Sequence, residues 1–218
     1  MAEIQTQKSE KRESTFIYSK GCMLLRFLFK TVLPVTYHDP KKMDREGPYI
    51  LLSNHISWID PVVIAAGCRA HEIRFVGKKE ITKNKFLAWL VGKLHMITID
   101  RHNTDMQAMR LCNQVLKEGK VLGIFPEGTR HLPDMMSEVE TGAAVLAFRS
   151  KASVLPVYIQ NKLKFFGRAH VYVGDPISFS DLYEQGMNPD TIQQFCTRVQ
   201  ETFWQMRKDY QHTARKKK

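Results

Sequence analysis

The sequence predicts an α/β domain in which helices flank a mixed β-sheet. Short apolar runs, typical of buried strands, alternate along the chain with longer stretches in which apolar residues recur at helical spacing. Turn residues, mainly Gly, Pro and Asp, separate the two kinds of segment. The chain has 218 residues, of which 43% are hydrophobic, and this is enough to bury one good core. We therefore expect one globular domain at 36–210, an N-terminal amphipathic segment at 1–35 and a basic tail at 211–218.

Strands and helices alternate in the first half of this domain. Asp60 and Pro61 resemble the N-cap and the first residue of a helix, respectively. Gly119 is a typical residue to follow the end of a helix. The predicted strands are Pro48–Leu52, Glu72–Gly77 and Met96–Asp100, and the predicted helices are Val62–Cys68, Lys85–Lys93 and Asp105–Glu118.

The second half continues the same alternation. The apolar run Val121–Phe125 predicts a buried strand. A long helix opened by Asn188 and Pro189 places apolar residues at helical spacing up to Met206. Between them we expect a helix at Ser137–Arg149 and strands at Val154–Ile159 and His170–Val173.

An amphipathic helix is predicted from Phe16 to Leu33. Its apolar part, 21–33, is interrupted by Arg26 and Lys30 and is shorter than the ~20 apolar residues that a membrane-spanning helix needs. On a helical wheel, Lys20, Arg26 and Lys30 fall within an arc of roughly 120°, and apolar residues cover the rest. This pattern predicts a helix that lies on a membrane surface with its cationic side toward lipid phosphates. The alternative is a helix packed on the core of the protein itself.

Composition narrows the partners and the compartment. The net charge of +11 favours anionic partners, whether nucleic acid, anionic lipid, a phosphorylated substrate or an acidic carrier protein. The residues up to Ser14 are polar and lack the apolar run of a cleavable signal peptide. The cysteines show no spacing typical of zinc sites or disulfides, which favours a reduced, cytosol-facing protein; they are Cys22, Cys68, Cys112 and Cys196.

His55 and Asp60 form a candidate catalytic pair. Attack by an alcohol needs a base to remove the hydroxyl proton, and histidine most often serves. A carboxylate can hold the imidazole in one tautomer by accepting a hydrogen bond from the other ring nitrogen. Residues five apart on a continuous helix do not face each other, so we expect a loop from Asn54 to Ile59 that brings Asp60 beneath His55. The alternative is that His55 only ends a strand and Asp60 only caps a helix.

A second candidate group directly follows the buried strand Val121–Phe125. Gly128 allows the backbone to turn tightly and to approach a ligand. Arg130 has a guanidinium that can bind a phosphate through two hydrogen bonds. Open α/β sheets place ligand sites at the carboxyl ends of their strands, so the segment Pro126–Arg130 is expected to bind a phosphorylated substrate.

Three segments together resemble the PlsC-type glycerolipid acyltransferases: NHISWID from Asn54, ITIDR ending at Arg101, and FPEGTR from Phe125 to Arg130. The resemblance extends from Tyr49 to Ile177 and includes LPV and VGDPI. It implies that 36–210 is an acyltransferase domain with His55 and Asp60 as catalytic residues. The substrate-binding residues that it implies are Lys78, Arg101, Glu127, Gly128, Thr129 and Arg130.

The resemblance also implies the reaction. The expected acceptor is the sn-2 hydroxyl of 1-acyl-sn-glycerol 3-phosphate, a lysophospholipid, and the product is phosphatidic acid. The acyl donor would be a thioester of coenzyme A (acyl-CoA) or of acyl carrier protein, with no cofactor and no metal. Ser57 lies in no G-x-S-x-G elbow, so direct attack on the thioester is favoured over an acyl-enzyme. The expected location is the cytoplasmic face of an anionic membrane, as a peripheral or monotopic protein.

Two alternatives remain open at this point. The acceptor could be glycerol 3-phosphate or another lysophospholipid, because the motifs report the chemistry more than the substrate. The chain could instead be a non-catalytic basic module for membrane or nucleic acid, although it has no recognised nucleic-acid motif.

Two places in the sequence leave the site assignment open. Arg101 could be an ordinary solvated charge after a strand. The sequence also departs from the family at Glu140 and Thr141, where a lysine often precedes the helix glycine.

Overall fold

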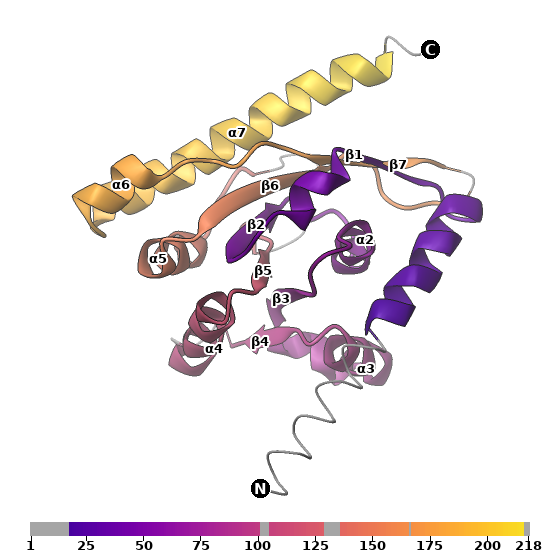
Figure 1. Cartoon of the computed structure of the whole chain (residues 1–218), viewed down its shortest axis with the longest axis horizontal. Coiled ribbons are helices and arrows are strands. Elements are labelled where there is room, and N and C mark those ends of the chain that lie inside the picture. Colours follow the sequence, from indigo (N-terminus) through magenta and orange to yellow (C-terminus); the bar gives the residue numbers. More distant parts are fainter. Residues whose placement is uncertain (1–17, 101–104, 129–135, 166, 216–218) are drawn as a thin grey trace, which may run out of the picture.

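A seven-stranded mixed sheet forms the centre of the protein (Figure 1). The structure is a computed structural model and describes residues 18–100, 105–128, 136–165 and 167–215. In spatial order across the sheet, the strands are β1 (Val35–His38), β7 (Ala169–Val173), β6 (Ser153–Ile159), β2 (Tyr49–Ser53), β5 (Val121–Ile124), β3 (Ile73–Lys78) and β4 (Ile97–Ile99).

Strand direction creates one edge at which many chain connections meet. Strands β6, β2, β5, β3 and β4 are parallel neighbours, so their carboxyl ends share this edge. Strand β7 is antiparallel to β6 and parallel to β1, so β7 and β1 both begin at the same edge. The predicted mixed sheet is therefore confirmed, and we call this side of the sheet the carboxyl edge.

Helices cover both faces of the sheet (Figure 1). The side chains of β2 alternate between the two faces: Ile50 and Leu52 contact one core cluster, and Tyr49 and Leu51 contact the other. The first cluster is covered by α4 (Met106–Lys117), α5 (Thr141–Ser150), α6 (Ser180–Gln185) and α7 (Pro189–Arg215). The second is covered by a helix over 18–31, the short helix η1 (Pro40–Asp44) and α2 (Asp60–Gly67), and the remaining helices are η2 (Lys79–Lys83) and α3 (Lys85–Lys93).

Several predicted boundaries differ from the structure. Strand β1 and helix α6 were not expected, and β1 begins at Val35, inside the predicted N-terminal segment. Helix α5 begins at Thr141 rather than at Ser137, because Glu140 is extended and its N–H donates to the Pro126 carbonyl (2.7 Å). Helix α7 continues to Arg215, so part of the predicted tail is helical.

The helix over 18–31 packs on the core and also presents apolar residues to solvent. Tyr18, Cys22 and Phe29 are buried in the second core cluster. On its outer side, Leu24 and Phe27 are 68% and 67% exposed. The alternative of a core-packed helix is therefore confirmed for one side of this helix, and the expected membrane contact of its exposed side stays a prediction. No helix in the described ranges is long and apolar enough to span a membrane.

Arg26 does not belong to an outward cationic arc, so this part of the prediction is wrong. Its Nε donates to the Ala66 carbonyl (2.7 Å) and its Nη2 to the Cys68 carbonyl (2.8 Å). Carbonyls at the end of a helix lack partners within that helix and attract a cation. The end of α2 therefore draws Arg26 inward, whereas Lys20 and Lys30 remain exposed.

Candidate active site

The carboxyl edge brings together residues that lie far apart in the sequence. His55 follows β2, the segment Phe125–Gly128 follows β5, and Lys78 is the last residue of β3. These strands are neighbours and parallel. The sheet order therefore places these three parts of the predicted site at one edge.

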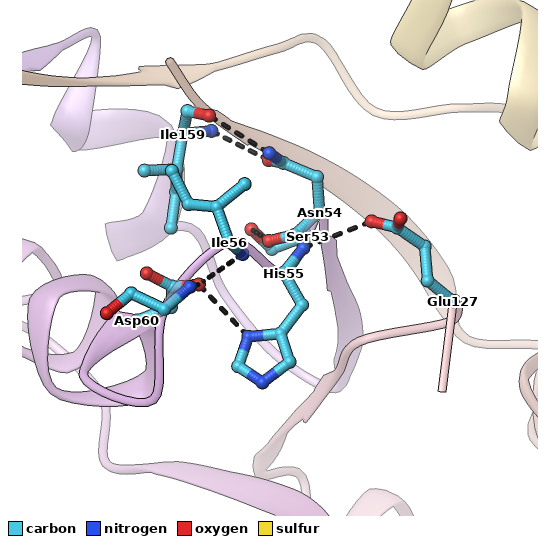
Figure 2. Close-up of polar contacts among 8 residues, drawn as sticks. Ser53, Asn54, His55, Ile56, Asp60, Glu127 and Ile159 are labelled. Atoms are coloured by element: carbon cyan, nitrogen blue, oxygen red, sulfur yellow. Dashed lines mark hydrogen bonds and ion pairs between the residues drawn. The ribbon is translucent and has the colours of Figure 1, made fainter. Parts of the chain in front are cut away.

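His55 and Asp60 are in direct contact, as the spacing predicted. His55 Nδ1 lies 3.0 Å from Asp60 Oδ2, and the two side chains are 20% and 3% exposed, respectively. Figure 2 shows the second ring nitrogen of His55 on the side away from Asp60. A carboxylate at this position selects the tautomer that carries its proton on Nδ1. The Nε2 lone pair is then available to accept a proton from a substrate.

The Asp60 carboxylate also shapes the loop between His55 and α2. Its Oδ2 accepts hydrogen bonds from the N–H groups of Ile56 and Ser57, both at 2.7 Å. The N-cap of α2 is Ile59, and no side chain caps this helix, so the prediction of Asp60 as the N-cap is wrong by one residue. The carboxylate turns back to the loop because three donors converge on it there.

Asn54 is a positioning residue that the sequence reasoning missed. Its amide nitrogen donates to the Ile159 carbonyl (2.9 Å), and its amide oxygen accepts from the Ile159 N–H (2.8 Å) (Figure 2). The side chain thus takes the place of a backbone partner for the last residue of β6, at the point where the chain leaves β2. This holds the backbone directly before His55. The sequence did contain a signal for this role, an asparagine directly after an apolar strand. Its partner could not be predicted, because it lies 105 residues further along the chain.

Glu127 approaches His55 from the other side. Its side chain is buried, and Oε1 accepts from the His55 N–H (3.1 Å) (Figure 2). Oε2 accepts from the Met136 N–H (3.2 Å). The carboxylate therefore links the loop after β5 to the backbone of the catalytic candidate. Its expected contact with the acceptor stays a prediction, whereas these two contacts support a positioning role.

Gly128 makes the predicted tight turn. Its φ is +67°, in the left-handed region that favours glycine, and its N–H donates to the Phe125 carbonyl (3.1 Å). Lys78 is partly buried at the end of β3. Arg101, Thr129 and Arg130 lie outside the described residues, so their expected roles stay predictions.

A pocket of about 590 Å³ lies near His55, although neither His55 nor Asp60 lines it. Phe125 forms part of its wall, and the Phe125 ring lies 4.3 Å from the His55 ring, measured between centroids. The volume is within the ordinary range for small-molecule sites. Most of the wall is apolar, and the apolar lining includes Val76, Ile99, Met106, Met109, Cys112, Ile124 and Leu146. Charged residues also line the pocket, namely Asp100, Asp105, Glu140 and Arg149.

The cysteines do not offer an alternative nucleophile. All four are buried and free. Burial raises the pKa of the Cys68 thiol to about 11 and that of the Cys112 thiol, which lines the pocket, to about 12. A thiol is nucleophilic as its thiolate, so these groups are unreactive near neutral pH. In the part of the chain that the structure describes, no group of three or more His, Cys, Asp or Glu side chains could hold a metal ion.

Comparison with known proteins identifies the class of this protein. A family model described as Acyltransferase matches residues 34–160. The chain therefore belongs to the acyltransferase family.

Its relatives include proteins that are named as acyltransferases. The 1-acyl-sn-glycerol-3-phosphate acyltransferase of Streptococcus pneumoniae is 30% identical over 195 residues, which cover 86% of this chain and 71% of that one. The Bacillus subtilis protein of the same name is 26% identical over 152 residues, which cover 67% and 75% of the two chains. The crystal structure of the 1-acyl-sn-glycerophosphate (LPA) acyltransferase PlsC from Thermotoga maritima has the same fold, with a TM-score of 0.62, 20% identity, and coverage of 92% of this chain and 82% of that chain.

Proposed function

We propose that the protein transfers a fatty acyl group from an acyl thioester to the sn-2 hydroxyl of 1-acyl-sn-glycerol 3-phosphate and so forms phosphatidic acid. The observation that carries this proposal is the His55–Asp60 pair, fixed at the carboxyl edge and in contact with Phe125, which also lines a largely apolar pocket. The names of the curated relatives support the choice of acceptor. The proposed donor is acyl-CoA or acyl carrier protein, with no further cofactor.

His55 acts as the base in the proposed mechanism. Its Nε2 takes the proton of the acceptor hydroxyl while the oxygen attacks the thioester carbonyl carbon. The Asp60 carboxylate keeps the ring oriented and stabilises the imidazolium that forms. The tetrahedral intermediate then collapses: the carbon–sulfur bond breaks, and the departing thiolate takes the proton from Nε2. The new ester bond and a free thiol remain, and His55 returns to its starting state.

The surroundings of the pair suggest where each part of the substrates binds. The apolar pocket beside Phe125 suits an acyl chain, because an apolar wall gains from removing that chain from water. Lys78 ends a strand at the same edge and suits the acceptor phosphate. We propose Arg101 and Arg130 as further contacts of the acceptor phosphate, because both lie in the sequence motifs that resemble the family.

We also propose that the helix over 18–31 binds an anionic membrane surface at the cytoplasmic face, where a lysophospholipid acceptor resides. Met23, Leu24 and Phe27 are exposed on this helix, and so are Lys20 and Lys30. Deleting residues 1–33 would be a poor test, because it removes the buried Tyr18, Cys22 and Phe29 and the bonds of Arg26 to the end of α2. A Phe27→Glu variant tests the same idea while it leaves the core intact.

An acceptor panel tests the proposed function. The purified protein is assayed with 1-acyl-sn-glycerol 3-phosphate, glycerol 3-phosphate and lysophosphatidylcholine, each with acyl-CoA and with acylated carrier protein, and His55→Ala serves as the inactive control. We expect the highest kcat/KM with 1-acyl-sn-glycerol 3-phosphate. Preference for another acceptor would overturn the substrate assignment, and no turnover with any pair would favour a non-catalytic basic module.

A further inference from the structure

The connection between β6 and β7 presents an exposed aromatic side chain at a tight turn. The turn is closed by a bridge between Lys164 and Gly167, and the Gly167 N–H donates to the Lys164 carbonyl (3.2 Å). Phe165 is 71% exposed, more than any other large hydrophobic residue that the structure describes. A phenyl ring left in water loses the burial free energy that it would gain in an apolar environment. The exposed ring gains significance only from the charges and the second apolar region that lie near it.

Cationic residues flank Phe165 on both sides in the sequence. Lys162, Lys164 and Arg168 are all exposed, and the ion pairs identified among the described residues do not involve them. An apolar tip with basic residues on both sides matches the surface of an anionic bilayer, in which phosphates lie outside and hydrocarbon inside.

The turn lies beside the end of the helix over 18–31. The Ala169 N–H at the start of β7 donates to the Pro34 carbonyl (3.0 Å), and Leu33 and Leu163 pack against the same core cluster. Figure 1 shows the connection from β6 to β7 next to the carboxyl end of this helix, where the chain enters β1. Val32, at that end of the helix, is 47% exposed. The two exposed apolar regions are therefore neighbours.

The turn also lies at the same edge of the sheet as the catalytic pair. Strand β6 runs parallel to β2 and ends at Ile159, whose backbone is bound by the Asn54 side chain. His55 follows Asn54 directly. A membrane that contacts the turn therefore faces the carboxyl edge.

We propose that the β6–β7 turn inserts Phe165 into an anionic bilayer and acts with the helix over 18–31 as a two-point docking surface that directs the carboxyl edge to the lipid. This inference rests on the proposed function, because a membrane-resident acceptor gives the docking its purpose. Two contacts on different elements define an orientation, whereas the helix alone would leave the protein free to rotate about the helix axis. The cationic flanks Lys162, Lys164 and Arg168 would attract the anionic headgroups before the ring inserts.

Vesicle flotation of the full chain tests the docking role. The variants are Phe165→Glu, Phe165→Leu and, as a matched control, Trp204→Glu, because Trp204 is an exposed aromatic on α7, which covers the opposite face. With vesicles of phosphatidylcholine and phosphatidylglycerol, we expect Phe165→Glu to lower the partition coefficient about tenfold, which corresponds to losing one buried side chain. Phe165→Leu and Trp204→Glu should bind like the wild type. Equal flotation of Phe165→Glu and the wild type would overturn the proposal.

The source of the attraction needs a second pair of measurements. A Lys162→Glu, Lys164→Glu double variant should lose binding to anionic vesicles, and high salt should weaken binding of the wild type.

Gel filtration without lipid tests whether the turn binds a second copy of the chain instead of a membrane. A wild-type dimer that becomes monomeric in Phe165→Glu would show such binding and would overturn the proposal.

Activity assays separate this inference from the proposed function. Phe165→Glu should lose turnover on an acceptor embedded in vesicles and retain turnover on a soluble short-chain acceptor. A wild-type protein with no acyl transfer on either acceptor would defeat the proposed function. Wild-type turnover together with unchanged activity of Phe165→Glu on vesicles would defeat only the role of the turn.

Discussion

The carboxyl edge of the sheet and the face covered by α4, α5 and α7 are built in opposite ways. At the edge, Asn54, Asp60 and Glu127 are buried and polar, and each binds backbone groups of its surroundings. On the helical face, the buried residues are almost all apolar, and Phe195 and Phe203 are completely buried. A buried polar group costs free energy unless its hydrogen bonds are made, and when they are made it holds a specific geometry. The edge thus provides geometry and the face provides stability, so substitutions in the two regions should affect different measurements.

The largest expected effect is on turnover at the edge. His55→Ala should lower kcat about 100-fold to 10,000-fold, the usual loss when a general base is removed, and Asp60→Asn should also be severely impaired because the imidazolium loses its counter-charge. The free energy of unfolding of His55→Ala, from urea titration, should change little. A folded His55→Ala protein with full turnover would refute the catalytic assignment.

The largest expected effect on stability comes from the helical face. Phe203→Ala removes a completely buried ring and should lower the free energy of unfolding by about 3–5 kcal/mol. Turnover per folded molecule should stay near that of the wild type at a temperature where the variant is folded. A large loss of kcat without a loss of stability would break the distinction between the two regions.

Arg130 is predicted to bind substrate rather than to hold the edge together. Arg130→Ala should raise the KM for a phosphorylated acceptor about 30-fold, since about 2 kcal/mol is the lower end of the loss for one partner of a charge pair. Initial rates over a range of acceptor concentrations give this value. An unchanged KM would show that Arg130 does not contact the phosphate.

A substitution of Glu127 distinguishes a role in positioning His55 from a role in binding the acceptor. Glu127→Gln replaces one acceptor oxygen by an NH₂ group, so the side chain can accept a hydrogen bond from only one of the two N–H groups, that of His55 or that of Met136. We expect kcat to fall about tenfold with little change in KM, because about 1–3 kcal/mol is lost when such a partner is removed. Glu138→Gln, at an exposed site two residues after Met136, is the control. A rise in KM with unchanged kcat would instead support the expected acceptor contact.

The smallest expected effect lies at the surface of the helical face. Arg198 on α7 donates to both carboxylate oxygens of Asp181 on α6, at 2.8 and 2.7 Å, and these hydrogen bonds lower the pKa of Asp181 to about 2. Because the pKa is lower in the folded state, the pair stabilises the protein above pH 4 and ceases to do so as the pH falls toward 2. Asp181→Asn should therefore lower Tm slightly at pH 6 and not at pH 2, by calorimetry. An equal loss of Tm at pH 6 and at pH 2 would show that this stability does not come from the ionised Asp181–Arg198 pair.

Local patterns were sufficient for much of the fold and for the reactive pair. Helical spacing and short apolar runs predicted most strands and helices, because these signals are contained within a few consecutive residues. The five-residue spacing of His55 and Asp60 required a bend, and their contact at 3.0 Å confirms it. Strand β1 was missed although its sequence, VTYH, alternates apolar and polar residues, because four residues are the shortest run in which such an alternation can be recognised.

The tertiary structure decided which groups face one another over long distances in sequence. Arg26 belonged to a cationic arc by its spacing, but the carbonyls at the end of α2, 40 and 42 residues away, hold it inward. Asn54 and Glu127 support His55 only because β6 and β5 flank β2. The turn that carries Phe165 lies beside the end of the helix over 18–31 only because β7 pairs with β1. Periodicity reports the face of an element that is apolar, whereas strand order and the unpaired backbone groups of neighbouring elements determine the partner of each side chain.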